Sequence, residues 1–486
     1  MIVKIEGITN RNYVENLCLI FFPGAKFPVD EEPSPTVPML ELTVEEADGV
    51  VSAYAKMSLG DDSATGTASR PLTAEMANKK AVGEAVLEAG KGLCGHQPAW
   101  GFLTGIRPAK IAADMVKSGL DGAGVRRKLR NEYFLIPKKA ALLTNIAQSE
   151  QEIIGKLPQN SCSVYISIPF CPTRCAYCSF VSYSTKRLLS MIPEYLIRLE
   201  RDIRDTFALI KELGMTVATV YVGGGTPTTL NEAELDRVLG TVCECVDVDS
   251  LMEFTVEAGR PDTVTEEKMR VMLSHGVTRV SINPQTFNDE VLRTIGRGHT
   301  VDDFYRAYDI ARNSGVKYIN TDLIAGLPGE GFRSFSKSVD AILSLRPDNI
   351  TYHTFCVKKA ADILKSDADI YSRTGGETQK SVDYTQLKSK GAGYLPYYIY
   401  RQKNSMGNLE NVGFSLPGAE GLYNIFIMEE VHSIFAIGAG AATKMVAPGR
   451  IKRTFMPKYP YEYLAMSEEA IAAHYGKIRE FFEETE

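Results

Sequence analysis

The first 155 residues show two successive patterns of apolar and polar positions. Residues 1–68 alternate between the two kinds of side chain in short runs, interrupted by the segment FPVDEEPSPTVP, which predicts strands joined by a proline-rich break. Over residues 69–155 apolar positions recur at helical spacing, in stretches such as TAEMANKKAVGEAVLEAG. We therefore predict a small N-terminal α+β unit over 1–68, followed by a helical region over 69–155.

From about residue 156 short β-rich runs alternate with helical stretches. The six runs are VYISI, VATVYV, EFTVE, RVSIN, YINTDLIAG and NITYHTF. This alternation predicts βαβ units on a parallel sheet, and we expect an α/β fold with a partial (βα)6 TIM-like barrel over 156–383. Functional residues in such sheets gather at the C-terminal ends of the strands. Residues 384–486 are mixed in pattern and rich in tyrosine and glycine, and we expect a separate C-terminal α+β domain that covers the substrate.

The composition limits the classes of partner. The chain has 486 residues, of which 44% are apolar and 23% are charged, as in an ordinary globular protein of about three domains. A net charge of -6 provides no field to attract nucleic acid or an anionic membrane. No apolar run approaches the roughly 20 residues of a membrane span, and the N-terminus is too polar for a secretory signal. The nine cysteines are odd in number and mostly scattered, so we expect a cytoplasmic location and no disulfide framework.

Three of the cysteines form one tight group directly after the first β-rich run. Cys171, Cys175 and Cys178 have the spacing CxxxCxxC. Cysteine thiolates are the usual ligands of iron–sulfur clusters, and a [4Fe–4S] cluster normally takes four of them. A zinc knuckle or three unrelated cysteines are the alternatives, but zinc sites usually pair CxxC with a second ligand pair, and no CxxC or HxxxH follows. The array therefore predicts a [4Fe–4S] cluster with one iron left open to a small molecule.

A glycine-rich turn follows the second β-rich run, in the sequence YVGGGTPT over residues 221–228. Glycines allow a ligand to approach the backbone closely, although a tight turn alone would also explain the triplet. Together with the cysteine array, this motif resembles the radical S-adenosylmethionine (SAM) superfamily. Within that superfamily, YISIPFCPTRCAYCSF, YVGGGTPT, SINPQTFNDEVLRTIGRGHT and NTDLIAGLPGE resemble the oxygen-independent coproporphyrinogen III oxidase family. The flanking GFLTGIRPAK and YYIYRQKN are most similar to its HemZ-type coproporphyrinogen dehydrogenase branch.

The resemblance implies two cofactors, a [4Fe–4S] cluster held by the three cysteines and SAM bound to the fourth iron. It implies that Tyr165 lies beside SAM, that Tyr177 lies near the adenine and that the glycine turn meets the methionine end. The other implied SAM contacts come from successive strand ends; the full implied set is Tyr165, Tyr177, Gly224, Gly225, Thr226, Glu257, Gln285, Arg297 and Asp322. Each charged member could instead belong to a buried ion pair or carry a solvated charge.

The resemblance also implies an activity. The family oxidatively decarboxylates two propionates of coproporphyrinogen III to give protoporphyrinogen IX in anaerobic heme biosynthesis, with an electron donor such as flavodoxin or ferredoxin. We expect His353 to contact this tetrapyrrole, and Arg401, Lys403, Lys358 and Lys359 are candidate partners for its carboxylates. A heme chaperone and a heme-modifying radical SAM methyltransferase are alternatives on the same scaffold. The chaperones carry a tryptophan-containing heme motif near the C-terminus, whereas no tryptophan follows Trp100 in this chain.

Overall fold

The computed structural model describes residues 1–28, 34–178, 180–356, 375–402 and 405–484. The chain divides into two compact units, one formed by Met1–Ser149 with Ile399–Glu410, and the other by Glu150–Tyr398 with Asn411–Glu486. The domain boundaries expected at residues 68, 155 and 383 stay predictions. The candidate cations Lys358, Lys359 and Lys403 lie outside the described residues.

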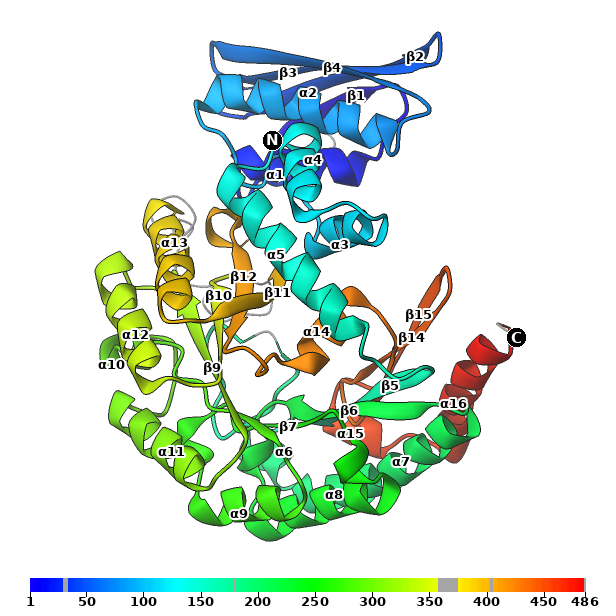
Figure 1. The fold of residues 1–486 in the computed structure, drawn as a ribbon, viewed down its shortest axis with the longest axis vertical. Coiled ribbons are helices and arrows are strands. Elements are labelled where there is room, and N and C mark those ends of the chain that lie inside the picture. The colour runs from blue at the N-terminus through cyan, green and yellow to red at the C-terminus, as the bar shows by residue number, and fades with distance from the viewer. Residues whose placement is uncertain (29–33, 179, 357–374, 403–404, 485–486) are drawn as a thin grey trace. The chain divides into compact units, whose positions relative to one another are not determined.

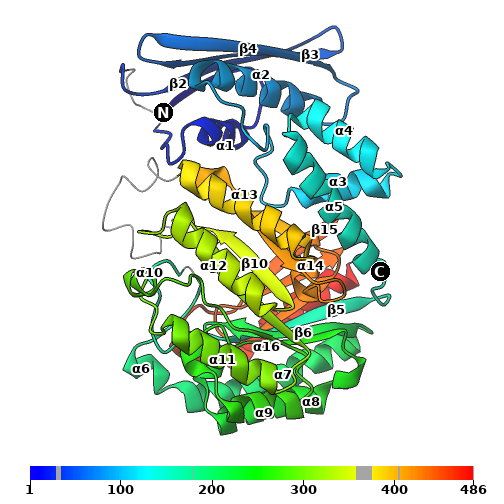
Figure 2. The same cartoon turned by 60° about the vertical axis from the view of Figure 1, so that its left-hand side comes forward.

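The first unit contains a four-stranded sheet in the order β1-β2-β3-β4. Strand β1 runs parallel to β2, and the other pairs are antiparallel; the strands are β1 (Ile2–Glu6), β2 (Met39–Ala47), β3 (Val50–Leu59) and β4 (Asp62–Pro71). Buried positions alternate along β3, as the sequence pattern predicts for a strand with one covered face. Its helices are α1 (Arg11–Phe21), α2 (Ala77–Cys94), α3 (Ala109–Lys117) and α4 (Gly122–Tyr133), while α5 (Pro137–Ile154) continues into the second unit. Helix α2 lies along the sheet, where a Cβ on Gly66 of β4 would stand 2.2 Å from the carbonyl oxygen of Ala85 (Figures 1 and 2).

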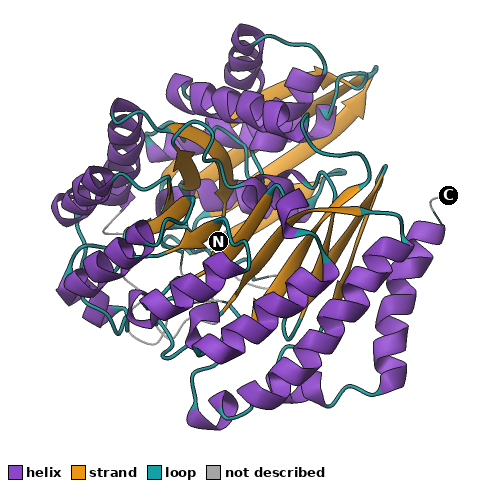
Figure 3. Cartoon of the chain, turned by 60° about the horizontal axis from the view of Figure 1, so that its bottom comes forward, coloured by secondary structure: helices purple, strands orange, loops and turns teal. Residues whose placement is uncertain are grey.

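Six parallel strands in sequential order form the centre of the sheet in the second unit. They are β5 (Ser161–Ile168), β6 (Thr216–Gly224), β7 (Glu253–Glu257), β8 (Arg279–Ser281), β9 (Tyr318–Ala325) and β10 (Asn349–Thr354). The main connecting helices are α7 (Ile192–Glu212), α8 (Glu232–Cys245), α9 (Glu266–Ser274), α11 (Val301–Asn313) and α12 (Phe332–Leu345). Figures 1 and 3 show these helices side by side along the outer face of the sheet. The predicted α/β class and the partial (βα)6 arrangement are confirmed.

Burial on both faces explains why these strands read as continuous apolar runs. In β5 every residue except Tyr165 is buried, including Val164, Ile166 and Ile168. Helix α7 covers the sheet with an apolar stripe that includes Leu196. Shorter helices occupy several connections: α6 (Lys186–Leu189), α10 (Asp289–Thr294) and the 3-10 turns η1 (Pro227–Thr229), η2 (Val248–Ser250) and η3 (Pro261–Thr263).

The C-terminal segment extends both edges of the same sheet, giving the order β11-β12-β10-β9-β8-β7-β6-β5-β13-β14-β15. The added strands are β11 (Leu395–Arg401), β12 (Glu410–Ser415), β13 (Ser433–Ile437), β14 (Ala442–Ala447) and β15 (Arg450–Phe455). The helices of this segment are α13 (Gly375–Gly391), α14 (Leu422–Glu429), α15 (Pro460–Leu464) and α16 (Glu468–Glu483), and η6 spans Met406–Asn408. Strand β13 runs parallel to β5, which brings residues near the C-terminus beside the strand that leads into the cysteine array. Within the described residues no helix has both the length and the apolar character needed to cross a membrane.

Candidate functional site

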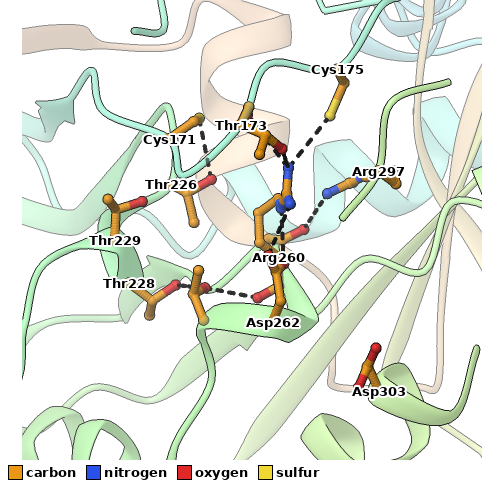
Figure 4. A network of polar contacts seen from close by, with 12 residues as sticks. Cys171, Thr173, Cys175, Thr226, Thr228, Thr229, Arg260, Asp262, Arg297 and Asp303 are labelled. Atoms are coloured by element: carbon orange, nitrogen blue, oxygen red, sulfur yellow. Dashed lines mark hydrogen bonds and ion pairs between the residues drawn. The ribbon is translucent and has the colours of Figure 1, made fainter. Parts of the chain in front are cut away.

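The cysteine array forms a loop that backbone hydrogen bonds fix against two neighbouring segments. The amide of Cys171 donates to the carbonyl oxygen of Tyr183 at 3.0 Å, and the amide of Ala176 donates to Ile295 at 3.0 Å, just beyond α10. The glycine turn is attached on the other side, since the amide of Thr226 donates to Phe170 at 2.8 Å. The loop therefore lies at the C-terminal ends of β5 and β6, as the parallel-sheet rule predicts (Figure 4).

The three thiols differ in their surroundings. Cys171 is buried, and its Sγ lies 3.4 Å from the Thr226 hydroxyl. Burial raises the pKa of the Cys171 thiol, while the bond with Thr226 opposes that rise. Cys175 and Cys178 are half-buried, and all three cysteines are free thiols. Cys171 is therefore the most enclosed of the three thiols.

The glycine turn is tightly enclosed by the cysteine loop. A Cβ on Gly225 would stand 2.5 Å from the carbonyl oxygen of Phe170, a distance that side chains do not tolerate. Gly224 has a φ of +112°, a left-handed conformation that favours glycine. A Cβ on Gly223 would lie 3.0 Å from Oε2 of Glu257. The glycines thus allow the turn to pack closely against the cysteine loop and the end of β7.

Three predicted site residues come together at the ends of β7, β9 and β10. Nε2 of His353 lies 3.5 Å from Oδ2 of Asp322. Burial raises the pKa of Glu257 to about 7, and the charge of Asp322 adds to the increase, whereas the Tyr221 hydroxyl, which donates to Oε1 at 2.5 Å, opposes it. A positively charged ligand here would favour the ionised form of Glu257.

Gln285 follows β8 and bonds to the end of β9 through its backbone. Its amide donates to Asp322 at 3.0 Å, and its carbonyl accepts from Ile324 at 2.9 Å. Its φ of +68° lies in the left-handed region, which is unusual for a residue with a side chain. Its side chain is buried, and within the described part of the chain Oε1 has no hydrogen-bond partner. Such an acceptor requires a ligand or an ordered water.

Arg297 and Tyr177 lie together beside the cysteine loop. Burial raises the pKa of Tyr177, and the nearby Arg297 guanidinium partly reverses that rise. Nη1 of Arg297 donates to the carbonyl oxygen of Gly259 at 3.2 Å. Its Nε is buried and has no protein acceptor among the residues that the structure describes. Arg297 and Gln285 therefore present a donor and an acceptor that the described protein does not satisfy.

Tyr165 joins an aromatic group that the sequence did not indicate. Its ring stacks against Tyr221 of β6 at 5.9 Å and against Tyr423 of α14 at 6.2 Å, measured between ring centroids. Tyr221 and Tyr423 are 4.5 Å apart. The position of Tyr221 inside YVGGGTPT was the only available signal for it, whereas nothing local marks Tyr423.

A second missed residue, Arg260, follows the end of β7. Its guanidinium group contacts Asp262, Thr173 and the sulfur of Cys175 (Figure 4). Its place three residues after Glu257 could have suggested a role near the strand ends. Only the structure brings it to the cysteine loop.

Arg401, the other candidate substrate residue, is buried, and a substrate contact for it stays a prediction. It belongs to the first unit, where its buried guanidinium group donates to the carbonyl oxygens of Leu103 and Asn408. The group also lies 5.3 Å from the centroid of the Trp100 ring. Burial lowers the pKa of Arg401 to about 10. These contacts bond the two terminal nitrogens of the guanidinium group within that unit, whereas its buried Nε has no hydrogen-bond partner among the described residues.

The residues present at the loop fit an iron–sulfur cluster with an additional small ligand. Among the described residues no three His, Cys, Asp or Glu side chains converge on one metal ion. A [4Fe–4S] cluster makes a different demand, because each thiolate binds its own iron. The three thiols and the unsatisfied atoms of Gln285 and Arg297 suit such a cluster and a polar ligand beside it.

Comparisons with known proteins agree with this chemistry. The model of the radical SAM superfamily matches residues 165–342. The chain is 35% identical over 497 residues to the oxygen-independent coproporphyrinogen-III oxidase-like protein HemZ of Bacillus subtilis, a match that covers 100% of this chain and 99% of that protein. It is 31% identical to the heme chaperone HemW of the same organism, over 60% of this chain and 74% of the relative. The solved structure of coproporphyrinogen III oxidase HemN from Escherichia coli, a radical SAM enzyme, is similar in fold, with a TM-score of 0.50 and 23% identity over 69% of this chain and 73% of that one.

Proposed function

Because the chain belongs to the HemZ family of oxygen-independent coproporphyrinogen-III oxidase-like proteins, within the radical SAM superfamily, we propose that it oxidatively decarboxylates coproporphyrinogen III. The superfamily uses a [4Fe–4S] cluster and SAM. In the proposed reaction two propionates each lose carbon dioxide, a hydrogen atom and an electron, and become the vinyl groups of protoporphyrinogen IX; the 5′-deoxyadenosyl group of SAM would take up the hydrogen atom and an external one-electron acceptor would take up the electron. A donor such as flavodoxin or ferredoxin would supply the reducing electron.

One observation carries the proposal. The CxxxCxxC loop is bonded to the glycine turn at the C-terminal ends of β5 and β6, and Glu257 at the end of β7 lies against the same turn, with Asp322 and His353 nearby. These ends are where parallel sheets bind ligands. The arrangement supports a single site for the cluster, SAM and the substrate.

The residues have separate roles in this proposal. Cys171, Cys175 and Cys178 would hold three irons, and the fourth would remain for SAM. When bound, the two cofactors would supply the radical chemistry that removes a hydrogen atom from a propionate carbon.

The polar residues would bind and orient SAM. Glu257 and Asp322 would face its positive groups as carboxylates. The unsatisfied atoms of Gln285 and Arg297 would exchange hydrogen bonds with its polar groups. Gly224 and Gly225, with Thr226 behind them, would let its methionine end lie against the backbone.

The aromatic and histidine side chains would shape the rest of the site. The stacked rings of Tyr165, Tyr221 and Tyr423 would help to exclude water from that side of the site. His353, paired with Asp322, remains our candidate for contact with the tetrapyrrole.

Anaerobic reconstitution of the full chain with iron and sulfide tests the proposal. Incubation with SAM, a reductant and coproporphyrinogen III should produce 5′-deoxyadenosine and protoporphyrinogen IX. The variant Cys175→Ala should lose cluster absorbance and turnover. The control Cys243→Ala should keep both, because Cys243 lies near the end of α8 beside His275. Turnover in Cys175→Ala would contradict the ligand assignment, and deoxyadenosine without any vinyl product would reject the substrate.

The similarity to HemW supports heme delivery as a second candidate. Against it, no tryptophan follows Trp100, so the tryptophan-containing motif of those chaperones is absent. Titration of the reconstituted protein with hemin distinguishes the two. Tight, stoichiometric hemin binding without turnover of coproporphyrinogen III would favour the chaperone.

A further inference from the structure

Arg260 places a buried guanidinium group beside the cysteine loop. It lies just after β7, at the start of η3, and only 2% of its surface is exposed. Nε and Nη2 donate to the two carboxylate oxygens of Asp262, each at 2.9 Å. Nη1 points the other way, donating to the Thr173 hydroxyl at 2.7 Å and lying 4.0 Å from the sulfur of Cys175 (Figure 4).

The guanidinium group of Arg260 has different partners on its two sides, and this difference indicates its role. Burying a guanidinium is costly unless its donors are bonded and its charge is paired. Asp262 supplies the charge partner on one side, and its side chain is 27% exposed, so an ion pair alone would not require Arg260 to be buried. The opposite edge of the guanidinium group faces Thr173 and Cys175 of the CxxxCxxC loop, which lie 87 and 85 positions earlier in the chain.

Thr173 and Cys175 lie two positions apart in that loop. The short bond to the Thr173 hydroxyl fixes the direction of Nη1, and the same nitrogen then faces the Cys175 sulfur. A thiolate there would attract the donor more strongly than a thiol, because the hydrogen bond would be charge-assisted. Asp262 is bonded to the opposite edge of the guanidinium, so the cation stands between the carboxylate and the sulfur (Figure 4).

We infer that Arg260 is a positioning residue that donates an N–H···S hydrogen bond to Cys175 and raises the reduction potential of the cluster held by this loop. The inference rests on the proposed function. Hydrogen bonds to the sulfurs and the net charge nearby set the potential of an iron–sulfur cluster. A cluster that accepts one electron from an external donor gains one negative charge, and a fixed cation beside it stabilises the reduced form more than the oxidised form. Arg260 would thus make the reducing step easier for a weak donor.

Two variants with opposite expected shifts test this inference. Arg260→Gln removes the charge, so the midpoint potential of the reconstituted cluster should become more negative. Asp262→Asn leaves the guanidinium uncompensated, so the midpoint potential should become more positive. A merely structural role would not give shifts of opposite sign. The measurement is a redox titration of the full chain monitored by electron paramagnetic resonance, with iron and sulfide content determined on the same samples.

The controls separate the possible failures. Arg204→Gln, which removes an exposed guanidinium paired with Glu244, should keep the wild-type potential. If the wild-type chain binds no cluster, the proposed function itself fails. If wild type and Arg260→Gln carry equal iron and have the same midpoint potential, only the inference about Arg260 is overturned. If Arg260→Gln cannot be loaded with a cluster, the test depends on Asp262→Asn. A midpoint potential in Asp262→Asn that equals the wild-type value or is more negative would then overturn the inference.

Discussion

The carboxyl group of Glu257 allows a quantitative test of the site's electrostatics. Burial raises its pKa to about 7 from an ordinary value of 4.5. Between these two pH values the folded protein keeps a proton that the unfolded chain has already lost. The free energy of unfolding should therefore fall as the pH rises through this window. Glu257→Gln removes the titration and keeps an oxygen that can accept the hydrogen bond from Tyr221.

The size of the effect follows from the two pKa values. One pKa unit corresponds to about 1.4 kcal/mol, so the ionisable side chain costs the folded state about 3 kcal/mol at pH 8 and about 1 kcal/mol at pH 5. The stability of Glu257→Gln relative to wild type should therefore be about 2 kcal/mol higher at pH 8 than at pH 5. Any effect of the substitution on stability that does not depend on pH cancels when the values at pH 5 and pH 8 are compared.

Urea denaturation of the metal-free full chain, followed by circular dichroism at pH 5 and pH 8, measures this difference. Burial also raises the pKa of Glu330 to about 7, but that group is present in both proteins and does not affect the comparison. Glu244→Gln, which replaces an exposed carboxylate of the same unit, is the matched control, and the change in stability difference between pH 5 and pH 8 should be smaller for it than for Glu257→Gln. A stability difference between Glu257→Gln and wild type that does not change with pH would refute the argument that burial holds the proton on Glu257.

Two further predictions concern other parts of the chain. In the first unit Glu410 pairs with the buried Lys139 and accepts a hydrogen bond from Trp100 at 2.9 Å, so Glu410→Gln should destabilise that unit by about 3 kcal/mol or more. Fluorescence of Trp100, the only tryptophan, reports this unfolding, and a loss below about 1 kcal/mol would contradict a buried, uncompensated Lys139. Gly225→Ala would bring a Cβ to 2.5 Å from the carbonyl oxygen of Phe170 and should displace the cysteine loop. Its iron content after reconstitution should fall well below that of wild type, and full loading would show that the loop tolerates the side chain.

Local patterns in the sequence were sufficient for the order and type of the barrel elements. The six β-rich runs correspond to β5 through β10, and the helices follow between them, because burial on one or both faces imposes a period that a short window reveals. The cysteine array and the glycine turn could also be read directly, since each acts through neighbouring residues. The parallel order then predicts that their strand ends lie together.

The local pattern could not indicate which distant side chains contact one another. Tyr221 and Glu257 are 36 positions apart, and Arg260 reaches Cys175 across 85. The partners of Arg401 show the same limit, because they include Leu103, 298 positions earlier in the chain.

The chain's own pattern therefore determined the α/β architecture, the cysteine loop and the strand ends where polar residues accumulate. Tertiary structure alone decided which of those residues face one another, which buried atoms lack a protein partner, and that β13 lies beside β5. The physical reason is that periodicity reflects burial, which each residue experiences locally. A hydrogen bond or an ion pair depends instead on how whole elements pack, and no short window of sequence carries that information.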